Sequence, residues 1–346
     1  MKQIIERDSN LELLRIILMI MIIAGHISVH HETPFELTNV DEIIKLLFWG
    51  MICVSVNTFI LISGFFGIQF KMERLAHLCL QTFFYSVIFM SIALMMGWRT
   101  LNPKTDFFAF LPILTKQYWF ITCYVVLYIL APWLNIWIDN LDRKMYRKFL
   151  MVGFLIIYLW STFNYLINAP QFIGDAGYGI VNFVYLYMLG RYIRLHYKEK
   201  HSSRFYFAGY ALSTILLFIC HYSLSWLFGF EFTSWLSYNT IFCLAGSVCL
   251  FMAFKNLKIH STLINYWAKP CLAVYLIHMA PNILSEVCCT YIGVKHYHGG
   301  AYMLILLTLP VIIYYVSATL EILRRNTIGQ LEDIIISKLK KTNLMK

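Results

Sequence analysis

Three residues that could bind anions or move protons stand in one apolar stretch near the start of the chain. Glu12, Arg15 and His26 belong to the run 11–31, whose other side chains are mostly apolar. In a helix, Arg15 and His26 are about 20° from alignment after three turns, and Glu12 lies about one turn before Arg15. Arginine suits phosphate groups, and histidine moves protons near neutral pH. The spacing predicts one helix face with an ion pair at one end and an imidazole about 16 Å further along.

A plainer interpretation of these residues stays open. Glu12 and Arg15 could only close an ion pair at a membrane interface, and His26 could be a hydrogen-bonded histidine near the other interface. However, all three residues lie on one stripe of an otherwise apolar helix, and placing polar residues inside a membrane costs free energy. A functional role is therefore as plausible as this structural one.

A second histidine stands inside another apolar run. His278 lies in the middle of 271–292, three residues before Pro281, which is expected to bend the helix. A histidine in the middle of a membrane is a functional candidate. His221, in the run 205–228, is an isolated histidine and is interpreted as structural.

The composition excludes a soluble globular domain. Of 346 residues, 60% are hydrophobic and only 13% are charged, too few to cover a water-soluble surface. Ten apolar runs predict an all-α, polytopic membrane protein of about ten transmembrane helices. The runs are expected to be helical because the N–H and C=O groups of an irregular backbone would find no hydrogen-bond partners in hydrocarbon. The runs are 11–31, 43–66, 76–97, 118–138, 149–168, 180–196, 205–228, 236–254, 271–292 and 301–323.

The basic residues predict the orientation of the chain. If the ten runs span, 22 of the 28 Lys and Arg residues fall on the side that carries both termini, and five fall on the other side. Positive charge is retained in the cytoplasm, so both termini are expected there. This bias also accounts for the net charge of +10, and no nucleic-acid partner is expected.

The domain organisation is expected to be simple. One transmembrane domain covers 1–323, and a basic, amphipathic tail over 324–346 suits a helix on the inner leaflet or a frayed cytoplasmic end. The first run is too long for a signal peptide and is expected to be retained. The nine cysteines fall in predicted spans without zinc-ligand spacing, so no metal site is expected. The bilayer is one partner, and a homo-oligomer is compatible with the sequence.

Together these segments resemble the acyltransferase 3 family of bacterial membrane-bound O-acyltransferases. The residues that carry the resemblance are Glu12, Arg15 and His26, the segment 59–65 followed by Lys71 and Arg74, Tyr118-Trp119-Phe120 with Pro132, and 275–278 ending in His278. The segment around Trp119 departs from many relatives because Gln117 and Tyr118 precede it and no acidic residue follows in the helix. Its role is therefore left open.

The resemblance implies an O-acetyltransferase of the bacterial cytoplasmic membrane. It implies transfer of an acyl group, usually acetyl, from cytoplasmic acyl-CoA to a sugar hydroxyl of a surface polysaccharide or its lipid-linked precursor. No bound cofactor is implied, since acetyl-CoA is a substrate. On this hypothesis His26 is the base, Glu12 holds Arg15, and His278 orients the intermediate or acceptor. The cations expected to bind the coenzyme A phosphates are Arg15, Lys71, Arg74, Arg191 and Arg194.

Two other classes of protein are considered. Buried Glu, Arg and His in ten spans would also suit a secondary transporter with a proton relay, although no internal symmetry is evident. A non-catalytic receptor or scaffold would need a large loop or binding domain, which the sequence does not offer.

Overall fold

The computed structural model describes residues 8–31, 36, 38–229 and 236–341, and these residues form helices without a strand. The all-α prediction is confirmed. Seven helices are long and apolar enough to cross a membrane, which indicates a multi-pass membrane protein. They are α1 (Ser9–Ser28), α2–α3 (Val40–Ile52 and Val54–Phe66), α4 (Met72–Met95), α6 (Trp119–Asp139), α7–η2–α8 (Arg143–Phe154, Leu155–Leu159 and Trp160–Leu166), α10 (Ser203–Phe228) and α15 (Gly299–Thr327).

Three of the predicted spans differ from uninterrupted long helices. Two are short: α9 (Ile180–His196) has 17 residues and α11 (Ile241–Lys255) has 15. The third is broken, because α12–α13 (Thr262–Ala268 and Cys271–His278) meets α14–η4 (Ile283–Ser285 and Glu286–Ile292) at 85°. Counting the broken pair as one span gives up to eight among the described residues, so ten spans stays a prediction.

The break after His278 has a local cause. Pro281 lacks an amide hydrogen and its ring disfavours helical backbone before it. Asn282 follows with φ of 64°, in the left-handed region. The helix therefore ends at His278 and restarts in a new direction at Ile283.

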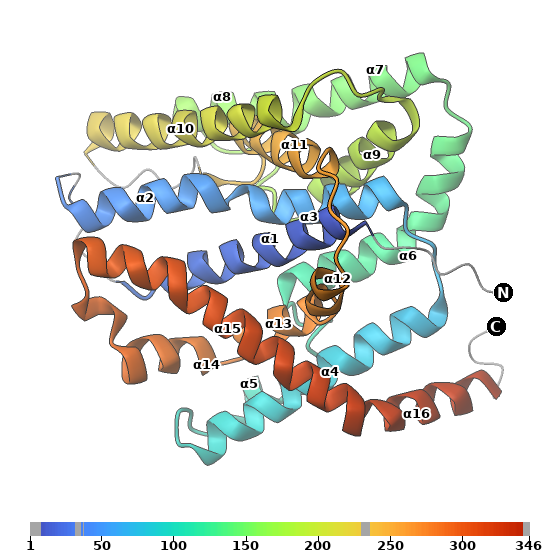
Figure 1. Ribbon diagram of the computed structural model, residues 1–346, viewed down its shortest axis with the longest axis vertical. Helices are drawn as coiled ribbons and strands as arrows, with labels where there is room; N and C mark the ends of the chain where they lie inside the picture. The colour runs from blue at the N-terminus through green and yellow to red at the C-terminus, as the bar shows by residue number, and fades with distance from the viewer. Residues whose placement is uncertain (1–7, 32–35, 37, 230–235, 342–346) are drawn as a thin grey trace.

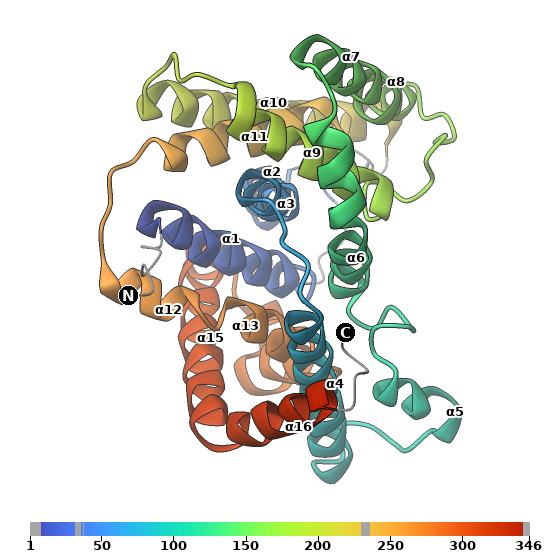
Figure 2. The same ribbon diagram turned by 90° about the vertical axis from the view of Figure 1, so that its right-hand side faces the viewer.

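The first helix lies in the interior of the bundle, between two groups of helices (Figures 1 and 2). One side of α1 contributes Leu14 and Leu18 to a core shared with α3, α9 and α11. Another side contributes Ile23 and Ile27 to a core shared with α13 and α15. Packing on both sides explains why α1 can keep a third, partly polar face in a defined position.

Glycines bring α3 and α9 into backbone contact. A Cβ added at Gly64 would lie 2.2 Å from the Tyr187 carbonyl oxygen, and one at Gly190 would lie 2.5 Å from the Leu61 carbonyl oxygen. Small residues allow close approach of membrane helices. This contact places the C-terminal ends of α3 and α9 beside each other.

The end of α15 is held by a buried carboxylate. Glu321 is fully buried and accepts hydrogen bonds from Tyr85 of α4 at 2.6 Å and from Arg324 and Arg325 at 2.7 Å each. Arg324 and Arg325 therefore belong to the α15 helix, although the predicted tail begins at 324. The helix α16 (Gly329–Lys341) follows, and three of its apolar side chains are exposed: Leu331, Ile334 and Ile335.

Candidate functional site

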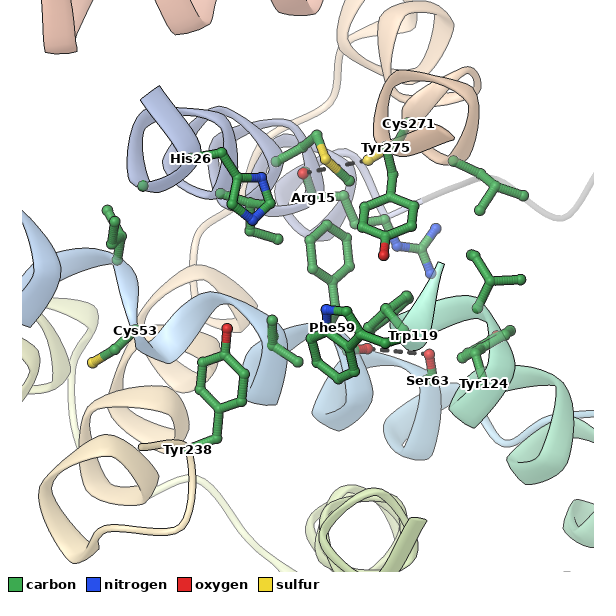
Figure 3. A pocket seen from close by; sticks show the side chains of 18 of the residues that line it. Arg15, His26, Cys53, Phe59, Ser63, Trp119, Tyr124, Tyr238, Cys271 and Tyr275 are labelled. Atoms are coloured by element: carbon green, nitrogen blue, oxygen red, sulfur yellow. Dashed lines mark hydrogen bonds between the residues drawn. The ribbon is translucent and has the colours of Figure 1, made fainter. Parts of the chain in front are cut away.

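A cavity of about 460 Å³ lies against the polar face of α1. Glu12, Arg15 and His26 all line it, so the structure brings these three predicted residues to one space. Helices α2, α3, α6, α12 and α13 supply most of the remaining wall (Figure 3). Its volume lies in the range of small-molecule binding sites.

The end of the cavity near the start of α1 is charged. Arg15 Nη1 lies 3.0 Å from Glu12 Oε1, which gives the predicted ion pair. The Arg15 side chain keeps 31% of its surface exposed, and Lys269 lines the same cavity. The carboxylate orients the guanidinium, while the exposed fraction leaves donors available to an anion.

Further along α1, His26 contacts His278 directly. His26 Nδ1 lies 3.1 Å from His278 Nε2, although the two residues are 252 positions apart in the sequence. His278 is buried at the end of α13, and its Nδ1 lies 2.7 Å from the Val274 carbonyl oxygen. The helix break after His278 thus leaves this side chain anchored to its own last turn and facing α1.

These contacts assign the tautomers of the two neutral rings. A carbonyl oxygen only accepts hydrogen bonds, so His278 Nδ1 carries the proton and donates a hydrogen bond to the Val274 carbonyl oxygen. His278 Nε2 is then an acceptor, and His26 Nδ1 must donate to it. The lone pair of His26 is left on Nε2. Because His26 lines the cavity, a hydroxyl group bound there can give its proton to this nitrogen.

An aromatic cluster forms another part of the cavity wall. Trp119 lies with its ring centre 4.7 Å from that of Tyr178 and 6.1 Å from that of Tyr238. Figure 3 shows Trp119 and Tyr238 on the side of the cavity across from α1. Flat aromatic faces suit the apolar C–H faces of a sugar ring, and the tyrosine hydroxyls add polar groups.

Two buried asparagines hold the loops that carry these tyrosines. Asn57 of α3 donates to the Tyr238 carbonyl oxygen at 2.8 Å. Asn182 of α9 donates to Asn57 Oδ1 at 3.1 Å and to the Gly177 carbonyl oxygen at 2.9 Å. The close α3–α9 packing therefore also positions the aromatic wall.

The other predicted cations do not line the cavity but lie near the C-terminal end of α3. Arg191 Nη1 would be 2.8 Å from a Cβ at Gly67, and the Arg194 guanidinium lies 4.9 Å from the Phe65 ring centre. On the other side, the Arg15 guanidinium lies 6.0 Å from the Phe66 ring centre. Lys71 and Arg74 are exposed at the start of α4, which follows.

Comparison with known proteins identifies the family. A family model described as an acyltransferase domain matches residues 8–320, most of the chain. The chain belongs to the acyltransferase 3 family. No curated protein and no solved structure shows significant similarity to it. The match includes every helix that lines the cavity, so the site described above lies within the acyltransferase domain.

Several residues that line the cavity were not predicted from the sequence. Lys269 was counted only as one of many basic residues, although its place before Pro270 and an apolar run marks a membrane boundary. Tyr178 lies in a loop outside the predicted runs. Tyr238 falls inside the predicted run 236–254, but α11 begins only at Ile241, which leaves Tyr238 in the preceding loop. Trp49 sits near the end of α2 and lines the cavity together with Cys53, the residue between α2 and α3.

Proposed function

We propose that the protein is a membrane O-acyltransferase that moves an acyl group, in particular acetyl, from acyl-CoA to a sugar hydroxyl. The acceptor is a cell-surface polysaccharide or its lipid-linked precursor. The observation that carries this proposal is one cavity lined by Glu12, Arg15 and Lys269 together with His26. A polyanionic donor and a base for a hydroxyl group are the two requirements of the reaction.

The proposed chemical step uses the lone pair of His26 Nε2. The acceptor hydroxyl gives its proton to this nitrogen while its oxygen attacks the thioester carbonyl carbon. The carbon–sulfur bond breaks, an ester forms, and the leaving coenzyme A thiolate takes this proton from the His26 imidazolium, which restores the neutral base. The hydrogen bond from His26 Nδ1 to His278 stabilises the imidazolium and keeps the ring oriented.

The donor enters from the cytoplasm in this proposal. The bias of Lys and Arg supports a cytoplasmic location for the end of the bundle where α1 begins, and for both termini, in a bacterial plasma membrane crossed about ten times. The pantetheine arm is narrow and reaches toward His26. The nucleotide phosphates bind at the end of the cavity near the start of α1, among Arg15, Lys269, Lys71 and Arg74. Arg191 and Arg194 are further partners for these phosphates.

The acceptor sugar stacks on Trp119, Tyr178 and Tyr238. Ring stacking orients the sugar without requiring a particular hydroxyl pattern, so the wall suits a polysaccharide unit. This gives the segment around Trp119 a role in acceptor binding, which the sequence left open.

Arg15 is predicted to govern donor affinity. Replacing Arg15 with Gln should raise the KM for acetyl-CoA about ten- to hundredfold, because a hydrogen bond to a charged group contributes about 1.5–3 kcal/mol. Steady-state kinetics of the purified protein in lipid nanodiscs would measure it. The double variant Glu12→Gln/Arg15→Gln also removes the carboxylate that pairs with Arg15 and should show the same rise. Arg143→Gln removes an exposed charge at the start of α7 and should leave KM unchanged. An equal effect of the two single variants would contradict the role of Arg15.

A secondary transporter remains the alternative, and the helix broken at 85° is the observation that favours it. Purified protein in nanodiscs, given acetyl-CoA labelled in the acetyl group and bacterial glycans, separates the two. The acyltransferase should release free CoA at a rate that depends on the glycan, and the label should appear on the glycan as a base-labile ester. Glycan-independent or absent CoA release would refute the proposal.

A further inference from the structure

Two histidines and a carboxylate converge near the end of α1 that is opposite the Glu12–Arg15 pair. His31 follows α1, Asp41 is the second residue of α2, and His298 immediately precedes α15. His298 Nδ1 lies 2.7 Å from Asp41 Oδ2, and His31 Nε2 lies 3.9 Å from the same oxygen. One ligand atom from each residue lies within 4.8 Å of the other two. Three segments far apart in sequence therefore direct nitrogen and oxygen ligands at one point.

The three side chains, His31, Asp41 and His298, differ in how far they are exposed, and this difference suits ion binding. The side chains of His31 and Asp41 are 1% and 6% exposed, whereas that of His298 is 66% exposed. The His31 ring is stacked on Tyr302 at 4.0 Å, and the Gly299 amide donates to Asp41 Oδ1 at 2.6 Å. Two ligands are thus held rigidly by their surroundings, and the third side is open for entry and for a water ligand.

Hydrogen bonds also hold the three residues of the cluster in place. His298 and Asp41 are hydrogen-bonded, and His31 Nε2 lies 2.9 Å from the Tyr297 carbonyl oxygen. At 3.9 Å, His31 Nε2 is too far from Asp41 Oδ2 for a hydrogen bond to that oxygen. Because a carbonyl oxygen only accepts, His31 Nε2 carries the proton in its hydrogen bond to Tyr297, and it must lose both the proton and this bond when it binds an ion. Ligand atoms around a tetrahedral zinc ion, each about 2.0–2.1 Å from it, lie about 3.3 Å apart. The observed separations of 2.7 and 3.9 Å lie on either side of that value.

The chemistry of the ligands selects the kind of ion. Mg²⁺ and Ca²⁺ prefer sets of oxygen ligands, whereas imidazole favours zinc and neighbouring transition metals. Two imidazoles, one carboxylate and an open fourth position are a common zinc ligand set. The sequence predicted no metal site because cysteine spacing was the criterion, and residues 31, 41 and 298 share no local motif.

We propose that His31, Asp41 and His298 bind a Zn²⁺ ion with one coordination position open to water. The ion joins the segment after α1, the start of α2 and the start of α15. Because those three helices pack on one another, zinc binding stabilises this end of the bundle. The proposal is independent of the acyl-transfer chemistry and of the cavity.

Zinc titration of the purified full-length protein, stripped of metal and of any histidine tag, tests the proposal. One Zn²⁺ should bind per chain by calorimetry, and Co²⁺ in its place should give the visible absorption of a tetrahedral ion. His298→Ala should weaken zinc binding at least about tenfold and abolish that spectrum. His298 is exposed, so this variant is expected to fold, and gel filtration checks that it does.

His296→Ala is the matched control, because His296 is an exposed histidine two residues away that is outside the cluster. It should bind zinc like the original protein. Asp41→Asn removes the charge while keeping the side-chain shape and should also weaken binding at least about tenfold. Zinc should raise the Tm of the original protein and of His296→Ala but not that of His298→Ala. Absence of zinc binding, or equal loss in the two histidine variants, would overturn the site.

Discussion

Replacing His26 with Gln should lower the acyl-transfer rate about 10²- to 10⁴-fold, the usual contribution of a positioned general base. Glutamine is similar in reach and can still hydrogen-bond to His278, but it cannot take a proton from the acceptor hydroxyl. The loss should therefore appear in kcat, with the KM for acetyl-CoA little changed. CoA release by equal amounts of folded protein in nanodiscs measures it.

His221→Gln is the matched control for this variant. His221 is also a buried histidine in a membrane helix, but it belongs to α10 and does not line the cavity. Its replacement should leave acyl transfer within about threefold of the original rate, since no group that touches the substrates is removed. If both glutamine variants lost activity equally, His26 would have a structural role and the proposed base would be wrong.

Variants of His278 test the tautomer assignment. His278→Asn should lower kcat about a hundredfold or more, because the short amide reaches the Val274 carbonyl oxygen but not His26. Without an acceptor for His26 Nδ1, the ring is free to carry its proton on Nε2 instead. A protonated Nε2 has no lone pair and cannot act as a base. His278→Gln places an amide oxygen near the position of the histidine Nε2 and can accept from His26 Nδ1. It should retain activity within about tenfold of the original.

The two amides make a matched pair because they differ only in reach. The same kinetic assay as for His26 applies, with Tm recorded for each variant. A structural role for His278 would lower Tm and activity together in both variants. Equal activity of the Asn and Gln variants would contradict the account, whether both were active or both inactive.

The polar face of α1 was predictable from sequence because one helix has a constant repeat. Glu12, Arg15 and His26 are related by turns of a single element, so their spacing is enough to bring them to one cavity. The His26–His278 contact was not predictable in the same way. It depends on how α13 packs against α1 and on where the helix breaks, and neither follows from local periodicity.

The break itself was foreseeable from Pro281, whereas its angle of 85° was not. Proline disrupts the helix locally, but the new direction depends on the left-handed backbone at Asn282 and on packing of the following segment. The aromatic wall of the cavity could not be predicted from the sequence for a similar reason. Tyr178 and Tyr238 come from separate loops that buried asparagines hold together, and hydrogen bonds between distant segments leave no pattern in the sequence.

The central claim is that acyl-CoA occupies the cavity along α1 with its thioester beside His26. A cryo-EM structure with a non-hydrolysable acyl-CoA ketone analogue, in lipid nanodiscs, tests it most directly. The account predicts that the phosphates contact Arg15 and Lys269, and that space for one hydroxyl oxygen separates the analogue's carbonyl carbon from His26 Nε2. An analogue bound outside this cavity, or inside it with its carbonyl turned away from His26, would contradict the account.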